Sequence, residues 1–242
     1  MLIPGVDALN HARAQPVSWV VTSPTSAQHG NTSTSTSTSF ISLVTHNTSS
    51  PGTEIFNNYG AKPNSELLLG YGFTLPANPD DTIVLKIGGT RDTTPNAAAA
   101  AATAHEVGRE ARGAASVWDA IVDAVRTEEE EGEEETPEWQ IILDSADMLR
   151  SMTKSLLARL PTPPTTIEVP GPEEPRTLRG DVVEMIRHYV SGQREVLQGL
   201  LQYADDREMG GVAVARHEGI VIELDGGGDD DLSDMLGCHQ ND

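Results

Sequence analysis

The uneven distribution of charge along the 242 residues is the strongest constraint on what this chain can fold into. Residues 1–87 contain three basic and five acidic side chains, whereas the whole chain carries a net charge of −21. The excess acid therefore lies after Gly88, and it includes seven glutamates between Glu128 and Glu135 and three aspartates at Asp229–Asp231. Blocks of like charge are usually solvated. The chain thus divides into a near-neutral first third and a long acidic remainder.

Composition excludes several classes of function. Hydrophobic residues make up 37% of the chain and aromatic residues 4%, which supports a core over part of the sequence only. The acidic balance argues against nucleic acid as a partner. No apolar run is long enough to span a membrane. The single cysteine, Cys238, excludes a disulfide framework and a cysteine-rich zinc site, and the seven histidines show no metal-ligand spacing. We expect an intracellular protein, in the cytoplasm or the nucleus, that uses no metal.

The first third reads as short strands separated by turns. β-Branched and aromatic residues predict strands at 17–22, 40–45 and 82–87, with a Ser/Thr-rich loop at 23–39 between the first two. Residues 54–56 predict a short buried piece. Asn64 is a candidate cap for a helix over residues 65–69 that ends near Gly70 and Gly72.

The remainder reads as helical. An alanine-rich run after Asn96 predicts a helix to about Arg126, with an apolar stripe near its end. Helical periodicity predicts further helices over 139–160 and 178–205. We expect an α+β protein with a β-rich domain at 1–88, a helical domain at 89–206 and an acidic, disordered tail at 207–242. The helical domain contains a Glu-rich loop at 127–137 and a Pro-rich linker at 161–175.

Glycine, asparagine and tyrosine concentrate at two places, Asn57–Gly60 and Gly70–Phe73. Glycine beside tyrosine permits close approach to the backbone while the ring lines a pocket. The same pattern also fits turn glycines beside core tyrosines, and the residue types alone do not decide between the two.

Four segments in order resemble one family. They are Asp7-x-x-Asn10-His11, then Gly52-x-Glu54-Ile-Phe-x-x-Tyr59-Gly60, then 64–81 with its Tyr71-Gly72-Phe73, and 187–197. Together they resemble SET-domain protein methyltransferases of the Rubisco large-subunit methyltransferase-like group. The resemblance covers residues 1–87 well and about 136–204 loosely. It implies a partial β-rich SET fold followed by a mostly helical substrate-binding domain.

The resemblance also implies an activity and a set of site residues. It implies S-adenosylmethionine as methyl donor and a lysine of a non-histone protein substrate as acceptor, although one subgroup modifies histidine. Tyr59 matches the catalytic tyrosine at the methyl-transfer site. Three residues match the cofactor site, namely Asn10, His11 and Phe73. Asp7 and Tyr71 match positions that line the substrate cleft.

The chain departs from the family pattern at its start. The family's first strands, with their glycine-rich cofactor segment, would lie before Met1, so we expect a truncated form with impaired cofactor binding and strands without neighbours. The alternative is a non-catalytic protein-interaction module that retains the helical domain. A third interpretation, an acidic adaptor that recruits basic proteins, depends on the glutamate run and the tail.

Overall fold

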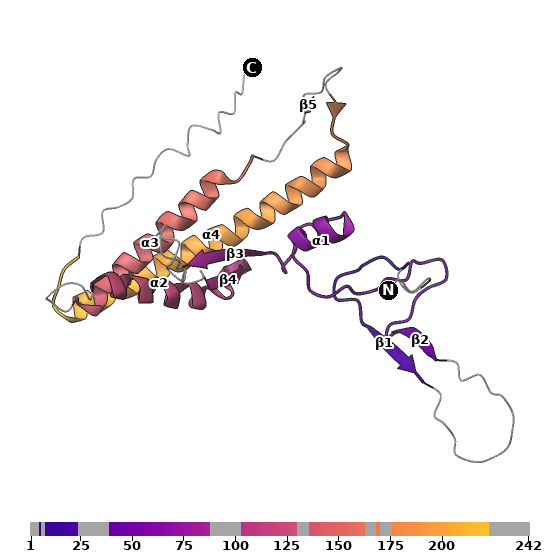
Figure 1. The fold of residues 1–242 in the computed structure, drawn as a ribbon, viewed down its shortest axis with the longest axis horizontal. Coiled ribbons are helices and arrows are strands. Elements are labelled where there is room, and N and C mark those ends of the chain that lie inside the picture. Colours follow the sequence, from indigo (N-terminus) through magenta and orange to yellow (C-terminus); the bar gives the residue numbers. More distant parts are fainter. Residues whose placement is uncertain are drawn as a thin grey trace, which may run out of the picture. The chain divides into compact units, whose positions relative to one another are not determined.

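The computed structural model describes Gly5 and residues 8–23, 39–87, 103–129, 136–162, 168–169 and 176–222. Several sequence predictions lie outside these residues: Asp7, most of the Ser/Thr-rich loop, the alanine run at 97–102, most of the glutamate run, most of the Pro-rich linker, and the tail from residue 223. The described part is α+β, as predicted, with short strands and four α-helices (Figure 1). It divides into two compact units, residues 1–82 with 163–192 and residues 83–162 with 193–242. The division into domains at 88 and 206 stays a prediction.

Unit 1 (residues 1–82 and 163–192) contains a hairpin of β1 (Val17–Thr22) and β2 (Phe40–Thr45), followed by α1 (Asn64–Tyr71). The strands are antiparallel, with Val17 opposite Thr45 and Thr22 opposite Phe40. Their bounds agree with the sequence prediction. Two very short strands, β5 (Glu168–Val169) and β6 (Arg176–Thr177), form a second antiparallel pair. The first of these falls inside the predicted Pro-rich linker.

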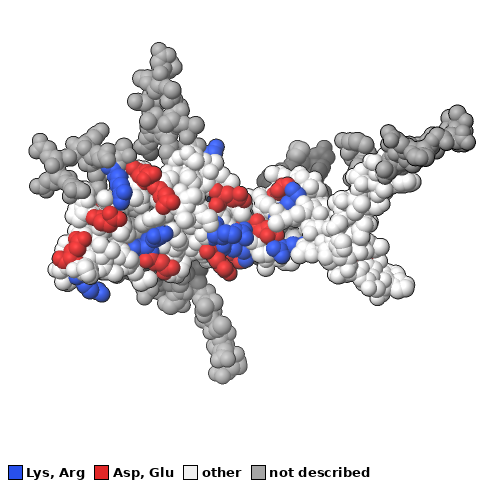
Figure 2. Space-filling view, turned by 90° about the horizontal axis from the view of Figure 1, so that it is seen from below, with Lys and Arg blue, Asp and Glu red and all other residues white. Residues whose placement is uncertain are grey.

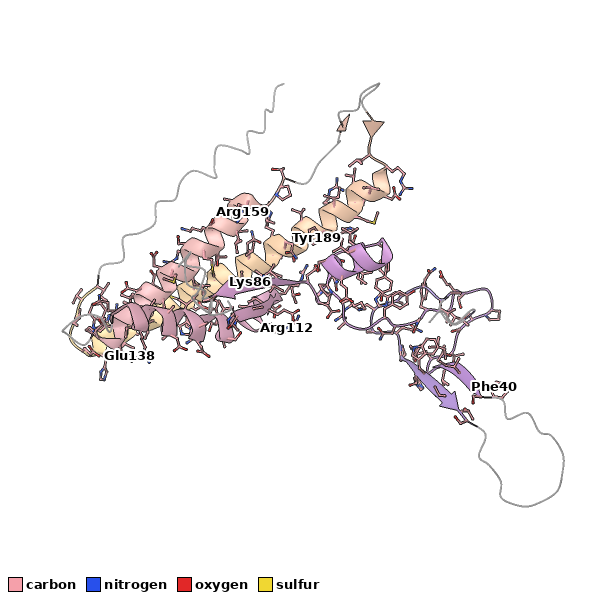
Figure 3. The ribbon with its side chains drawn as sticks, in the orientation of Figure 1. Phe40, Lys86, Arg112, Glu138, Arg159 and Tyr189 are labelled. Atoms are coloured by element: carbon pink, nitrogen blue, oxygen red, sulfur yellow. The ribbon has the colours of Figure 1, made fainter. Side chains whose placement is uncertain are left out.

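The β1–β2 hairpin is an uncharged surface. Trp19, Val20 and Val21 are consecutive and all accessible, so apolar side chains are exposed on both faces of the ribbon. Phe40, at the start of β2, is 61% exposed (Figure 3). The space-filling view shows this region without a charged side chain, whereas red and blue residues alternate over the helical part of the molecule (Figure 2).

Unit 2 (residues 83–162 and 193–242) contains most of the hydrophobic core. A two-stranded sheet of β3 (Thr82–Ile87, whose first residue belongs to unit 1) and β4 (Thr103–Gly108) packs with α2 (Ala114–Glu129) and α3 (Glu138–Arg159). The second part of α4 (Gly180–His217) completes it. The predicted apolar stripe of α2 is buried here, facing side chains from the other helices. The core comprises Leu85, Val107, Ala114, Val117, Trp118, Ile121, Val125, Ile141, Ala146, Leu149, Val196, Leu200 and Ala204.

Outside the candidate site, local predictions were wrong at three places. Residues 103–108, expected inside the alanine-rich helix, form β4, because Val107 is completely buried in the core beside β3. The segment 54–56 is not buried, and Ile55 is 45% exposed. The last helix does not end at residue 205 but continues to His217, so the beginning of the expected disordered tail is helical.

The extension of α4 has a packing reason. A Cβ on Gly211 would come within 2.9 Å of a methyl carbon of Ile142, so the missing side chain lets α4 lie close against α3. Ala215, one turn further on, is completely buried. Tertiary contacts here outweigh the low helix propensity of the Gly210-Gly211 pair. None of the helices in the described part of the chain has the length and apolar character needed to cross a bilayer.

Candidate functional site

The site is built where two segments far apart in sequence run side by side in unit 1. His11 and Asn57 form a parallel β-bridge. The backbone N–H of Ala12 donates to the carbonyl of Asn57 at 2.9 Å, and the N–H of Asn57 donates to the carbonyl of Asn10 at 2.8 Å. These bonds fix the segment that carries Asn10 and His11 against the segment that carries Tyr59.

Helix α1 brings the third segment. The helix ends at Tyr71, and Gly72 adopts a left-handed conformation with φ of 75° while its N–H donates to the carbonyl of Leu68. A glycine accepts this conformation without the steric penalty that a side chain would bring. The turn directs the chain back immediately after the helix, and so Tyr71 and Phe73 lie on the same side as Tyr59.

Four rings from these segments form an aromatic cluster (His11, Tyr59, Tyr71 and Phe73). Tyr59 lies at the centre, stacked on His11 with ring centroids 5.1 Å apart and on Tyr71 at 4.8 Å. Phe73 closes the group, 6.0 Å from His11 and 6.3 Å from Tyr71. These separations are typical of favourable aromatic pairs. The structure therefore brings together the four aromatic residues that the sequence singled out.

Tyr59 and His11 are also joined by hydrogen bonds. The backbone N–H of Tyr59 donates to Nδ1 of His11 at 3.0 Å, and the Tyr59 hydroxyl donates to the carbonyl of Leu9 at 2.7 Å. An imidazole nitrogen that accepts a hydrogen bond belongs to the neutral ring. Burial, the largest influence, lowers the pKa of His11; the Asp80 carboxylate raises it and the Lys62 ammonium lowers it, and the net shift is downward. His11 is thus held neutral beside Tyr59.

Asn10 lies at the rim of the cluster, where its side-chain amide donates to Oε1 of Glu54 at 2.6 Å. Glu54 is part of the motif that carries Tyr59, but no role was predicted for it from the sequence. Asp7, the remaining predicted site residue, lies outside the described residues.

A buried polar network holds α1 in place, and the sequence did not reveal it. Asn64 is not the cap of α1 but its first residue, and it is completely buried. Its side-chain oxygen accepts the backbone N–H of Leu75 at 2.7 Å, and its side-chain nitrogen donates to the carbonyl of Leu75 at 2.9 Å. Its backbone N–H donates to the Asp81 carboxylate at 2.8 Å. Asn78 donates to the carbonyl of Lys62 at 2.8 Å. Buried polar groups are costly unless they are paired, so this network specifies one conformation for the chain around Tyr71 and Phe73.

Two ion pairs border the cluster, through Lys62 and Asp80, whose charges both act on His11. The Lys62 ammonium lies 5.8 Å from the ring centroid of Tyr71 and forms an ion pair with Glu66. That position is within the range of a cation–π contact. The Arg13 guanidinium binds both carboxylate oxygens of Asp80, at 2.6 and 3.0 Å. Among the described residues, no group of three histidine, cysteine or acidic side chains could hold a metal ion.

Two glycines leave space beside the rings. Gly60 and Gly72 both have positive φ, and a Cβ built on either would meet no atom within 4 Å. A ligand could therefore approach the backbone next to Tyr59 and Tyr71 closely. Open backbone, aromatic faces and a neutral imidazole together suit a flat heterocycle or a cation rather than an anion.

Comparison with known proteins adds an activity class. The sequence matches no family model. Over 87 residues the chain is 39% identical to ribosomal lysine N-methyltransferase set10 of Schizosaccharomyces pombe and 36% identical to ribosomal lysine N-methyltransferase 1 of Saccharomyces cerevisiae. Each match covers 36% of this chain but only 14% and 12% of the two relatives. Part of the chain is therefore similar to protein-lysine N-methyltransferases, and it spans a small share of their length.

Proposed function

We propose that this chain carries part of the active site of an S-adenosylmethionine-dependent protein-lysine N-methyltransferase of the SET type, in the Rubisco large-subunit methyltransferase-like group. The observation that carries the proposal is the convergence of His11, Tyr59, Tyr71 and Phe73, from three separate motif segments, on one aromatic cluster. The similarity to two ribosomal lysine N-methyltransferases supports the same activity. We propose a non-histone protein as substrate, with ribosomal proteins as the first class to test, in the cytoplasm or nucleus.

The residues present fit the adenosyl and sulfonium parts of the cofactor. His11 and Phe73 offer ring faces on which a purine can stack, and Asn10 offers an exposed amide at the rim. Aromatic faces also attract a sulfonium cation, and the Lys62 ammonium above Tyr71 is an example of a cation at this cluster. When bound, S-adenosylmethionine would supply an electrophilic methyl group for in-line transfer.

The protein's part in the reaction would be to favour the neutral form of the amine, whose proton passes to solvent, and to orient it. A lysine amine reacts only when neutral, although its reference pKa is about 10.4. Aromatic walls around the amine would lower that pKa by desolvation, and a neighbouring positive charge would lower it further. The Tyr59 hydroxyl donates a hydrogen bond to the carbonyl of Leu9, so the lone pairs of its oxygen are available to accept an N–H of the amine. This contact would turn the nitrogen lone pair toward the methyl group. Catalysis would come mainly from positioning.

The test uses the protein as its own cells make it. Tyr59→Phe is introduced at the chromosomal gene, with Tyr71→Phe as the matched control that loses a hydroxyl but keeps the ring. The protein is captured with an antibody against α3 and incubated with tritiated S-adenosylmethionine and ribosomes from cells in which the gene is deleted. We expect methyl transfer to ribosomal lysines, a loss of about 10²-fold with Tyr59→Phe because the amine is no longer aligned, and a much smaller change with Tyr71→Phe.

Two results would contradict the proposal. Equal activity in the Tyr59→Phe protein would remove Tyr59 from the reaction. Absence of transfer by the unaltered protein, to ribosomes and to whole-cell protein alike, would favour the alternative of a non-catalytic interaction module.

A further inference from the structure

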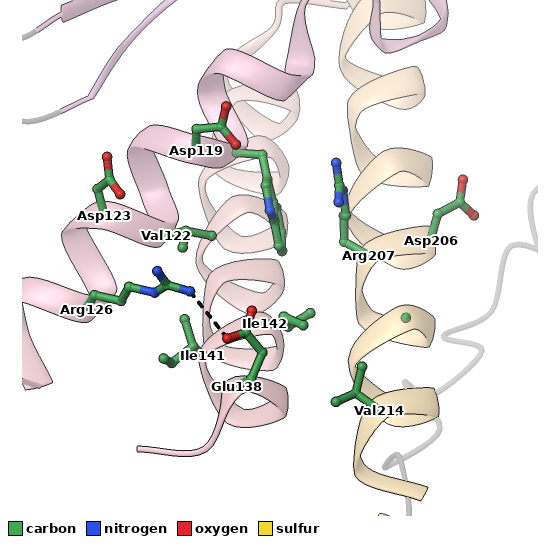
Figure 4. A pocket seen from close by; sticks show the side chains of 12 residues that line it. Asp119, Val122, Asp123, Arg126, Glu138, Ile141, Ile142, Asp206, Arg207 and Val214 are labelled. Atoms are coloured by element: carbon green, nitrogen blue, oxygen red, sulfur yellow. Dashed lines mark hydrogen bonds and ion pairs between the residues drawn. The ribbon is translucent and has the colours of Figure 1, made fainter. Parts of the chain in front are cut away.

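A groove of about 590 Å³ lies on unit 2 between α2, α3 and the last part of α4 (Figure 4). Its floor is apolar and is formed by residues from all three helices. Trp118 is nearly buried, whereas Val122 and Ile142 are half-buried and present accessible surface to the groove. The apolar lining comprises Trp118, Val122, Ile141, Ile142 and Val214. The volume lies within the range of pockets that bind ligand side chains or small molecules.

The rim of the groove is acidic. Four carboxylates line it, two from α2, one from α3 and one from α4, against two guanidinium groups. The four are Asp119, Asp123, Glu138 and Asp206. The excess negative charge makes the groove complementary to a cationic partner.

Both arginines are held by neighbouring side chains. Arg126 forms an ion pair with Glu138 at 3.5 Å (Figure 4). The Arg207 guanidinium lies 5.0 Å from the ring centroids of Trp118 and Tyr203 and donates to the Tyr203 hydroxyl at 2.6 and 3.0 Å. Arg207 is thus part of the wall. By contrast, the Asp206 carboxylate accepts a hydrogen bond from the neutral side-chain amide of Gln202 at 3.1 Å, and this bond does not compensate its negative charge.

The sequence adds negative charge between two residues of the groove. Arg126 and Glu138 both line the groove, and the stretch of chain that connects them contains all seven glutamates between Glu128 and Glu135. An approaching basic segment would be attracted over a distance of about a Debye length, roughly 10 Å at moderate salt.

The composition of the chain argues that the occupant is another protein. With 16 basic against 37 acidic residues, a second copy of the chain carries the same net charge of −21 and would be repelled as a whole, so the positive charge comes from another protein. We propose that the groove between α2, α3 and α4 docks a basic segment of a partner protein, in which lysines or arginines flank an aliphatic side chain. The aliphatic side chain packs on Trp118, Val122 and Ile142, and the cationic groups contact Asp119 and Asp206. This inference concerns unit 2 and does not depend on methyl transfer.

Gly210 permits a test that blocks the groove without damaging the fold. It lines the groove on α4, and a Cβ at this position would meet no atom within 4 Å. Gly210→Trp therefore fills the groove from an open helical position, and Gly210→Ala is the matched control that leaves most of the space free. A second pair of variants tests the charge of the groove. The double variant Asp119→Asn/Asp206→Asn removes two carboxylates that line the groove. Its control is Asp147→Asn, because the Asp147 side chain is 80% exposed on α3 and does not line the groove.

The probe is a fluorescein-labelled peptide in which lysines and arginines flank a pair of leucines, titrated with the full 242-residue chain by fluorescence anisotropy. We expect saturable binding that weakens with added salt. Gly210→Trp should weaken it by at least about tenfold, and the Asp119/Asp206 double variant should weaken it and flatten the salt dependence. Gly210→Ala, which adds only a methyl group to the groove, should weaken binding much less than Gly210→Trp does, and Asp147→Asn should bind as the unaltered chain does.

Three outcomes would overturn the proposal. The first is no saturable binding of the peptide. The second is binding that Gly210→Trp leaves unchanged, which would place the contact elsewhere on the chain. The third is equal affinity for a peptide in which serine replaces both leucines, because attraction to the glutamate run alone would then account for the binding.

Discussion

At the scale of single residues, His11 shows how a motif residue serves the fold and the site together. Its ring stacks on Tyr59, and its Nδ1 accepts the N–H of the same residue at 3.0 Å. A protonated imidazole has no free acceptor nitrogen, so protonation would break this bond. The neutral ring is therefore required for the geometry that places Tyr59 beside Leu9 and Tyr71.

The lowered pKa of His11 predicts a specific pH dependence. Because its folded-state pKa lies below the reference value of 6.5, the unfolded chain binds more protons in the interval between the two values. The stability contributed by neutral His11 is thus complete above pH 6.5 and is lost as the pH falls through that interval. We expect the gap in melting temperature between the unaltered chain and His11→Phe to narrow below pH 6.5, and the NMR titration midpoint of His11 to lie below 6.5. A midpoint at or above that value would contradict the prediction.

At the scale of elements, two glycines on α4 should respond in opposite ways to the same substitution. A Cβ on Gly192 would come within 2.8 Å of the Asp81 carboxyl carbon, and Asp81 cannot easily move because it is buried and bonded to Asn64. A Cβ on Gly210 meets nothing. We expect Gly192→Ala to lower the free energy of unfolding by about 1–3 kcal/mol through overpacking, and Gly210→Ala to raise it by about 0.5–1 kcal/mol through helix propensity.

Urea denaturation of the two variants and the unaltered chain measures both effects. Equal shifts of the same sign would show that helix propensity alone governs these positions. The comparison also tests the buried network of Asn64, Asn78 and Asp81, because a loosely held Asp81 would make room for the alanine at position 192.

The elements also show what the sequence could and could not predict. Strands with β-branched and aromatic residues were located to the residue, and the apolar stripe of α2 identified core residues, because both signals are local. The same local signals failed at 103–108, where pairing with β3 overrides helix propensity, and at the end of α4, where contact with α3 overrides two glycines. Within the site, the motifs located the aromatic residues. The roles of Asn64 and Asp81 depend on hydrogen-bond partners that lie eleven to seventeen positions away in the sequence. Short-range sequence patterns do not indicate such partners.

At the scale of the whole molecule, the two units use different means of stabilisation. Unit 2 contains the contiguous hydrophobic core, and the Arg150 guanidinium on α3 clamps α4 by binding Asp205 and Glu208. Burial lowers the pKa of Arg150, but the hydrogen bonds that its guanidinium donates to the two carboxylates outweigh this effect, so the pKa is raised. In the described part of unit 1, four of the buried side chains are the polar residues Asn57, Asn64, Asn78 and Asp81, and the β1–β2 hairpin exposes apolar residues. A two-stranded hairpin alone is marginally stable in water, which makes this hairpin the element most in need of further contacts.

The net charge of −21 sets the response of the whole chain to salt. Self-repulsion of an excess charge destabilises a compact state, and salt screens it. Exposed ion pairs such as Arg126–Glu138 lose strength in salt, but each contributes only about 0–1 kcal/mol. Since acidic residues outnumber basic ones by more than two to one, relief of repulsion should dominate. We expect the melting temperature to rise on addition of sodium chloride, by roughly 2–4 °C for each 1 kcal/mol gained.

The glutamate run provides the control for this expectation. Replacing its seven glutamates by glutamine removes a third of the net charge, so the variant should melt at a higher temperature in low salt and respond less to added salt. Replacing serines and threonines of the 23–39 stretch by alanine leaves the charge unchanged and should leave the salt response unchanged as well. A melting temperature that falls with salt in the unaltered chain would mean that ion pairs, Arg150 with its carboxylates foremost, outweigh the repulsion. The same glutamine variant should weaken docking of the basic peptide without abolishing it, because the carboxylates of the groove itself remain.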